Sequence, residues 1–136
     1  MKMIYEKKGD SIIHSHSFLS ENAQITIELN PPTVTKSKLE LLREYRVNRL
    51  SMGEQSFDDN ILKFLGRTHT ARRALEAVEA AMETGYQNIN IDLLYKIPKQ
   101  TPSNIKHDLD TAVSLEINHI SLFGLNIKPN CLTWLT

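Results

Sequence analysis

Apolar and polar positions follow two distinct patterns along the chain. Short runs rich in branched and aromatic residues predict strands at residues 25–29, 47–52, 89–95 and 119–125. Between these runs, apolar residues recur at spacings of three and four and predict helices that begin at Thr35, at Asp58 or Asp59, at Thr70 and near Pro102. The predicted stops for the second strand and for two of the helices are Gly53, Gly66 and Gly85.

The predicted order of elements is therefore β-α-β-α-α-β-α-β. The connections are long enough for right-handed crossovers between parallel strands. This favours an α/β fold in which helices cover a parallel sheet, either open or part of a barrel. The predicted apolar faces of the helices include Leu41, Met82 and Val113.

Three of the predicted strands have one apolar face and one polar face. Side chains alternate along a strand, so the apolar faces carry Ile25, Ile27, Leu29, Leu50, Met52, Ile89, Ile91 and Leu93. The opposite faces carry Thr26, Glu28, Asn30, Arg49, Ser51, Gly53, Gln55, Asn90, Asp92 and Leu94. A carboxylate such as that of Asp92 is costly to bury in a parallel sheet, whose two faces are normally covered. On one strand such groups could satisfy one another, but three strands with the same parity favour a ligand held inside a wide or incomplete barrel.

The composition narrows the classes of partner. The 136 residues include 16 Lys and Arg and 16 Asp and Glu, so the net charge of zero favours neither nucleic acid nor an anionic membrane. No apolar run approaches the roughly 20 residues of a transmembrane helix, and the charged segment 1–10 is unlike a secretory signal. The single cysteine, Cys131, is too few for a disulfide or a thiolate cluster and fits a reducing, cytoplasmic compartment. We expect residues 1–23 to form an N-terminal segment of uncertain structure and residues 24–136 to form the domain.

Five motifs in order give the chain a specific resemblance. They are residues 25–31 (ITIELNP), 47–59 (VNRLSMGEQSFDD), 65–69 (LGRTH), 90–101 (NIDLLYKIPKQT) and 119–123 (HISLF). Together they resemble the oxygen-independent coproporphyrinogen III oxidase family of radical S-adenosylmethionine (SAM) proteins, and the second and third look more like its haem-chaperone branch. The resemblance implies the third to sixth strands of a (β/α)6 partial TIM-type barrel, in a fold that carries SAM and a [4Fe–4S] cluster.

The resemblance also implies a set of SAM contacts. Glu28, Gln55, Arg67 and Asp92 match the family's contact positions, and Asn126 matches a weaker fifth one. Arg67 would suit the carboxylate of SAM, because a guanidinium binds a carboxylate through two parallel hydrogen bonds. Glu28, Gln55 and Asp92 would suit the ribose and the ammonium group, in an order that the sequence leaves open.

The chain departs from the family pattern in ways that bear on function. The family's Cys-x-x-x-Cys-x-x-Cys and Gly-Gly-Gly-Thr-Pro segments do not occur in it, so it looks like a fragment or a truncated relative. Glu54 stands where the family usually has valine, and Lys96 where it usually has glycine. Both changes weaken the expectation of tight SAM binding.

The expected function is that of a piece of a radical SAM protein in porphyrin or haem biosynthesis or haem delivery, inactive alone, with porphyrin or haem as partner. In the oxidase branch, the SAM-derived radical abstracts hydrogen from a propionate of coproporphyrinogen III, which leads to decarboxylation; in the chaperone branch, the protein binds and delivers haem. The alternatives are a non-catalytic module that binds SAM, a nucleoside or haem, and an inactive remnant. An exposed edge on the first strand would favour self-association unless residues 1–23 cover it.

Other candidate ligands are weaker. His14 and His16 lie two residues apart and could share a strand face as metal or haem ligands. We expect His69 to support a helix start, His119 to be a surface or packing residue, and Cys131 to be a structural thiol.

Overall fold

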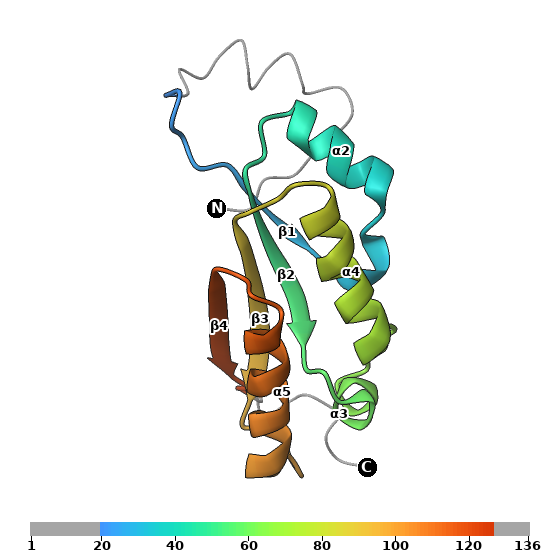
Figure 1. Ribbon diagram of the computed structural model, residues 1–136. Helices are drawn as coiled ribbons and strands as arrows, with labels where there is room; N and C mark the ends of the chain where they lie inside the picture. Colours follow the sequence, from blue (N-terminus) through green and yellow to red (C-terminus); the bar gives the residue numbers. More distant parts are fainter. Residues whose placement is uncertain (1–19, 127–136) are drawn as a thin grey trace.

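A four-stranded parallel sheet is the centre of this computed structural model, which describes residues 20–126 (Figure 1). The strands lie side by side in chain order: β1 (Thr26–Leu29), β2 (Arg49–Gln55), β3 (Ile89–Tyr95) and β4 (His119–Gly124). The connections contain the 3-10 helix η1 (Pro31–Thr33) and the helices α2 (Lys36–Glu44), α3 (Asp59–Phe64), α4 (Ala71–Glu83) and α5 (Pro102–Ser114). The predicted α/β class, element order and parallel pairing are confirmed. The candidates His14, His16 and Cys131, and most of the expected segment 1–23, lie outside the described residues.

The helix starts lie where the sequence places them. The side chains of Thr35, Asp58 and Thr70 each accept a hydrogen bond from a backbone N–H in the first turn of α2, α3 and α4. Helix α5 begins after Thr101, which forms a reciprocal capping box with Asn104. Local side-chain chemistry therefore sets the start of each of these helices.

Left-handed backbone conformations mark several element ends. Gly66 and Gly85, with φ of +68° and +89°, follow α3 and α4 as predicted. The prediction that Gly53 ends the second strand is wrong, because β2 continues to Gln55, and it is Gln55 that has a positive φ, of +70°. Lys96 has φ of +58°, so the position where the family usually has glycine adopts the conformation that glycine favours.

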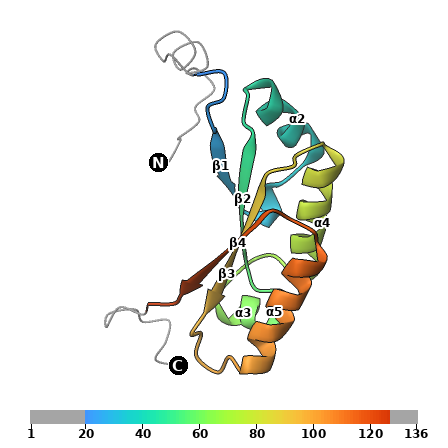
Figure 2. The same ribbon diagram turned by 60° about the vertical axis from the view of Figure 1, so that its left-hand side comes forward.

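The hydrophobic core lies between the sheet and the helices, which cover one of its faces (Figures 1 and 2). Its most buried side chains include Leu50, Met52, Ala74, Ala77, Val78, Ala81, Ile89, Ile91 and Leu93. The placing of Leu41, Met82 and Val113 on buried helix faces is wrong, since they are 41%, 43% and 67% exposed. Each is a sequence neighbour of a buried residue and is therefore turned by about 100° from it around the helix.

The opposite face of the sheet carries no helix from residues 20–126 (Figure 2). This is the face to which the alternation of β1, β2 and β3 assigns the polar side chains. None of the helices in the same range is long and apolar enough to cross a membrane.

Candidate functional site

A cavity of about 710 Å³ lies against the polar face of the sheet. Its walls come from β1, β2, β3, the residues Gln24 and Asn30 on either side of β1, and the segment between α3 and α4. Polar lining residues include Thr26, Asn30, Arg49 and Ser51. The alternation read from the sequence therefore gathers the polar side chains of neighbouring strands around one space.

Four of the five predicted site residues line this cavity. Glu28 comes from β1, Gln55 from the end of β2, Asp92 from β3, and Arg67 from the segment that follows α3. The fifth, Asn126, is exposed beyond the end of β4 and is not among the lining residues. The structure thus brings together side chains that are up to 64 positions apart in the sequence.

Most of the charged groups in the cavity have no partner within the described part of the chain. The side chains of Glu28, Arg49, Gln55 and Arg67 make no hydrogen bond or ion pair among residues 20–126. With Asp92, the cavity offers carboxylates, guanidinium groups and an amide. Such a set suits a ligand that carries a carboxylate together with cationic or hydroxyl groups.

Asp92 differs from the other predicted residues in the cavity because a hydrogen-bond network holds it. Ser51 Oγ donates to Asp92 Oδ2 at 3.2 Å, and Asn90 Nδ2 donates to Asp92 Oδ1 at 2.7 Å and to Ser51 Oγ at 2.8 Å. Asn90 is 2% exposed and Ser51 is 8% exposed. The carboxylate is therefore held in one orientation, with part of its acceptor capacity left for a ligand.

The network continues onto β4 through His119 and Ser121, which were not among the predicted site residues. Because Asn90 Nδ2 donates to Ser51 and Asp92, its Oδ1 is the acceptor for Ser121 Oγ at 2.9 Å and for His119 Nδ1. In this arrangement His119 contacts Asn90 through Nδ1, and within residues 20–126 its Nε2 makes no hydrogen bond. His119 is exposed, as expected of a surface residue, but its hydrogen bond to Asn90 was not predicted, and its register opposite Asn90 was the missing signal.

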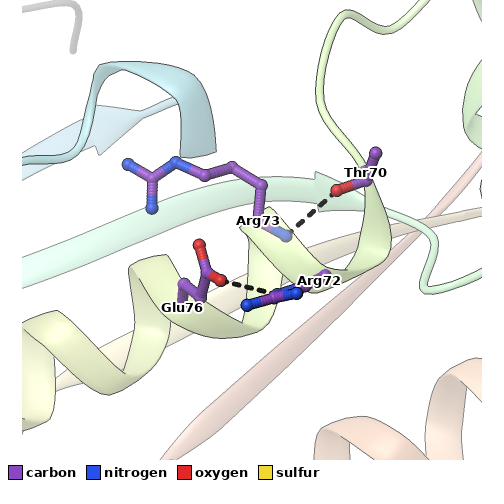
Figure 3. A network of polar contacts seen from close by, with 4 residues as sticks. All are labelled: Thr70, Arg72, Arg73 and Glu76. Atoms are coloured by element: carbon purple, nitrogen blue, oxygen red, sulfur yellow. Dashed lines mark hydrogen bonds and ion pairs between the residues drawn. The ribbon is translucent and has the colours of Figure 1, made fainter.

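Glu54 and His69 lie beside the site rather than in it. Glu54 has 0% exposure, and within residues 20–126 neither of its carboxyl oxygens has a hydrogen-bond partner. Burial raises the pKa of Glu54 to about 8, and the positive charge of Arg73 opposes this shift. His69 Nε2 lies 3.3 Å from the Glu54 carbonyl oxygen, so it contacts the end of β2; burial lowers the pKa of His69. Figure 3 shows Arg73 in the first turn of α4, beside the Thr70 cap and the pair between Arg72 and Glu76.

Residues 2–112 match the family model of the radical SAM superfamily, and the chain belongs to this superfamily. Within it, the similarity is to the heme chaperone HemW and coproporphyrinogen III oxidase group, which confirms the resemblance drawn from the five motifs.

Three relatives define the similarity. Heme chaperone HemW of Bacillus subtilis is 37% identical over 110 residues, which are 81% of this chain and 29% of that protein. Oxygen-independent coproporphyrinogen III oxidase of Pseudomonas aeruginosa is 34% identical over 85% of this chain and 25% of its own length. The solved structure of coproporphyrinogen III oxidase (HemN) from Escherichia coli, a radical SAM enzyme, has a TM-score of 0.80 at 29% identity, over 88% of this chain and 28% of that one. The chain therefore spans less than a third of the length of these proteins.

The residues present fit the two cofactors of the family differently. The unpartnered carboxylate, amide and guanidinium groups of the cavity match the chemistry of SAM, which carries a carboxylate, an ammonium group and a ribose diol. A [4Fe–4S] cluster needs several thiolates, and the sequence has one cysteine, Cys131. Within residues 20–126, no three His, Cys, Asp or Glu side chains are grouped as a metal site. This chain alone therefore does not fit the cluster.

Proposed function

We propose that this chain is the SAM-binding part of a radical SAM protein of the haem-chaperone and coproporphyrinogen oxidase group, with the barrel part beginning near residue 24. The observation that carries the proposal is that Glu28, Gln55, Arg67 and Asp92 surround one cavity. They come from three strands and a loop, and each matches a SAM-contact position of the family.

Each group has a role that its chemistry supports. Arg67 binds the carboxylate of SAM, since a guanidinium fork fits two carboxylate oxygens. Asp92 accepts from a ribose hydroxyl or from the ammonium group, and Ser51 and Asn90 orient it. Glu28 and Gln55 take the remaining donors. Asn126 contributes only if the backbone after β4 bends toward the cavity.

Titration calorimetry with SAM tests this assignment. We expect Asp92→Ala and Arg67→Ala to weaken SAM binding by about 10- to 100-fold, because each removes a charged hydrogen-bond partner. Matched controls are Asp110→Ala on α5 and Arg72→Ala on α4, which remove exposed members of i,i+4 ion pairs. Figure 3 shows the pair between Arg72 and Glu76. Wild-type protein that does not bind SAM, or unchanged binding in both cavity variants, removes the proposal.

The proposal limits what the chain does by itself. Cleavage of SAM needs an electron from a reduced cluster, and the thiolates for that cluster are not in this sequence. We therefore expect no 5′-deoxyadenosine from the chain after reconstitution with iron, sulfide and a reductant. Formation of that product would show that the chain assembles the cluster in another way.

A second candidate function is haem or porphyrin binding in a reducing, cytoplasmic compartment. It is favoured by the similarity to proteins named heme chaperone HemW, and it includes the case of a non-catalytic binding module. Titration with haem while the Soret absorption is recorded tests it. A saturable shift that His119→Ala abolishes would assign the iron to the His119 imidazole on β4, whereas a shift that His107→Ala abolishes would assign it to α5.

A further inference from the structure

The turn that follows Gln55 is held by two side chains of α5. Asp108 Oδ1 accepts a hydrogen bond from the backbone N–H of Phe57 at 2.6 Å. Ser56 Oγ donates to the same carboxylate and lies 3.0 Å from Oδ1 and 2.9 Å from Oδ2. One turn earlier on the same helix face, Asn104 Nδ2 donates to Asp58 Oδ2 at 2.9 Å. The three residues after Gln55 are therefore fixed by a helix that lies about 50 positions further along the chain.

The contact is buried and uses the carboxylate as an acceptor only. Asp108 is 2% exposed and Ser56 is 0% exposed, on a helix whose other acidic residue, Asp110, is exposed. Ser56 Oγ also accepts a hydrogen bond from the backbone N–H of Asp58 at 3.1 Å, so a hydrogen bond within the turn stabilises it as well. Burial raises the pKa of Asp108, and the Phe57 and Ser56 hydrogen bonds lower it. A carboxylate is retained there at the cost of desolvation.

The contact between α5 and the turn would fix the backbone conformation of Gln55, which directly precedes the turn. It has a positive φ of +70°, which is unfavourable for a residue with a side chain, and the register between β2 and β3 shifts between Met52 and Gln55. A conformation of this kind persists only where the surroundings impose it. The Ser56–Asp58 turn, attached to α5, is the part of the surroundings that follows Gln55 directly.

We propose that Asp108 is a positioning residue that holds the turn after β2 so that the Gln55 amide projects into the cavity. Its test by SAM binding rests on the proposed SAM site, whereas its test by the conformation of Gln55 in the ligand-free chain does not. Asp108 lines no part of the cavity, so it acts through Gln55 rather than by touching the ligand.

A double-mutant cycle tests the coupling. Asp108→Asn keeps the shape of the side chain but replaces one acceptor oxygen with a donor, and we expect it to weaken SAM binding about tenfold. Gln55→Ala should weaken binding by a similar factor, and the double variant should be no weaker than Gln55→Ala alone. Asp110→Asn, the same change at the exposed acidic position of α5, should leave binding unchanged. If the losses of SAM affinity in the two single variants add up in the double variant, Asp108 acts independently of Gln55, and the inference is wrong.

A ligand-free measurement separates this inference from the proposed function. In nuclear magnetic resonance spectra of the chain without SAM, Asp108→Asn should move the backbone and side-chain amide signals of Gln55. Lys99, another residue with positive φ, should keep its signals. If the Gln55 signals move but the wild-type chain binds no SAM, the proposed function fails and the positioning role stands. If they stay in place, the positioning role is wrong whatever the chain binds.

Discussion

Glu54 on β2 and Arg73 on α4 interact electrostatically, yet no hydrogen bond joins them. The Arg73 guanidinium donates instead to the carbonyl oxygen of Val34, and the Glu54 carboxyl group is buried without a hydrogen-bond partner in the described structure. Burial therefore raises the pKa of Glu54 to about 8, and the negative charge of Asp92 adds to the effect. The strand that supplies Gln55 to the cavity thus carries a carboxyl group that is protonated near neutral pH.

We expect Glu54 to make the free energy of unfolding fall as the pH rises from about 4.5 to about 8. The unfolded chain releases this proton near 4.5 and the folded chain near 8, so between these values the folded state binds more protons and a rise in pH favours unfolding. In urea titrations, Glu54→Gln should gain stability relative to wild type across this range, by at most ~5 kcal/mol. The exposed Glu79→Gln should follow wild type. A gain that does not change with pH would contradict the prediction.

Glu54→Val should stabilise the protein at neutral pH by about 1–3 kcal/mol, because it removes two buried oxygens that have no hydrogen-bond partner among residues 20–126. Valine also suits a strand and is the residue that the family usually has there. Glu54→Ala removes the same oxygens but leaves a cavity, so it should gain less. Thermal unfolding at a fixed pH measures both, and a Glu54→Val protein no more stable than wild type would show that the carboxyl group is satisfied in solution.

The features that could be predicted from the sequence are those that depend on neighbouring residues. Alternation along the strands placed Glu28 and Asp92 on one side of the sheet, and side-chain capping placed the helix starts at Thr35 and Thr70. Strand alternation and helix capping each depend on residues that are close together in the sequence, so a short segment is enough to predict them.

The remaining features depend on register and on contacts between distant segments. His119 supports the Asp92 network only because β4 pairs with β3 in one register, and that pairing cannot be read from either strand alone. Asp108 lies 52 positions from Ser56, on a face of α5 that otherwise resembles an ordinary amphipathic helix. The strand end at Gln55 was missed because Gly53 is the more usual stop, whereas the tertiary contacts hold the turn two residues later.

Gln55→Gly should separate stability from ligand binding. Glycine adopts positive φ without a steric cost, so we expect a gain of about 1 kcal/mol in the free energy of unfolding. The same change removes the cavity amide and should lower SAM affinity to the level of Gln55→Ala. Lys99→Gly, at an exposed residue with φ of +68°, is the matched control and should gain stability without a change in affinity. Equal affinity of wild type and Gln55→Gly would exclude Gln55 from the site.

The outer edge of β1 is unpaired within the described residues, and this leads to a further prediction. Within residues 20–126, β1 pairs only with β2, so its other edge offers free backbone groups. We expect either self-association or coverage by residues 1–23, and slow amide exchange along residues 26–29 in both cases. Light scattering across a dilution series distinguishes the two. A monomer whose amides in this strand exchange rapidly would argue against both.

Two helix-ending glycines should respond differently to the same substitution. Gly66 and Gly85 both have positive φ, so alanine at either position should cost about 1 kcal/mol of backbone strain. A Cβ at Gly66 would have no heavy atom within 4 Å, whereas one at Gly85 would lie 2.4 Å from Arg43 Nη1.

Arg43 would have to move, and it would lose its hydrogen bond to the Thr84 carbonyl oxygen and its position 5.8 Å from the centre of the Tyr86 ring. Gly85→Ala should therefore destabilise the protein by about 1 kcal/mol more than Gly66→Ala, since that hydrogen bond and the cation–π contact are each of this order. Urea unfolding of both variants in an Arg43→Ala background should bring the two losses close together. If the difference persists there, Arg43 is not its cause.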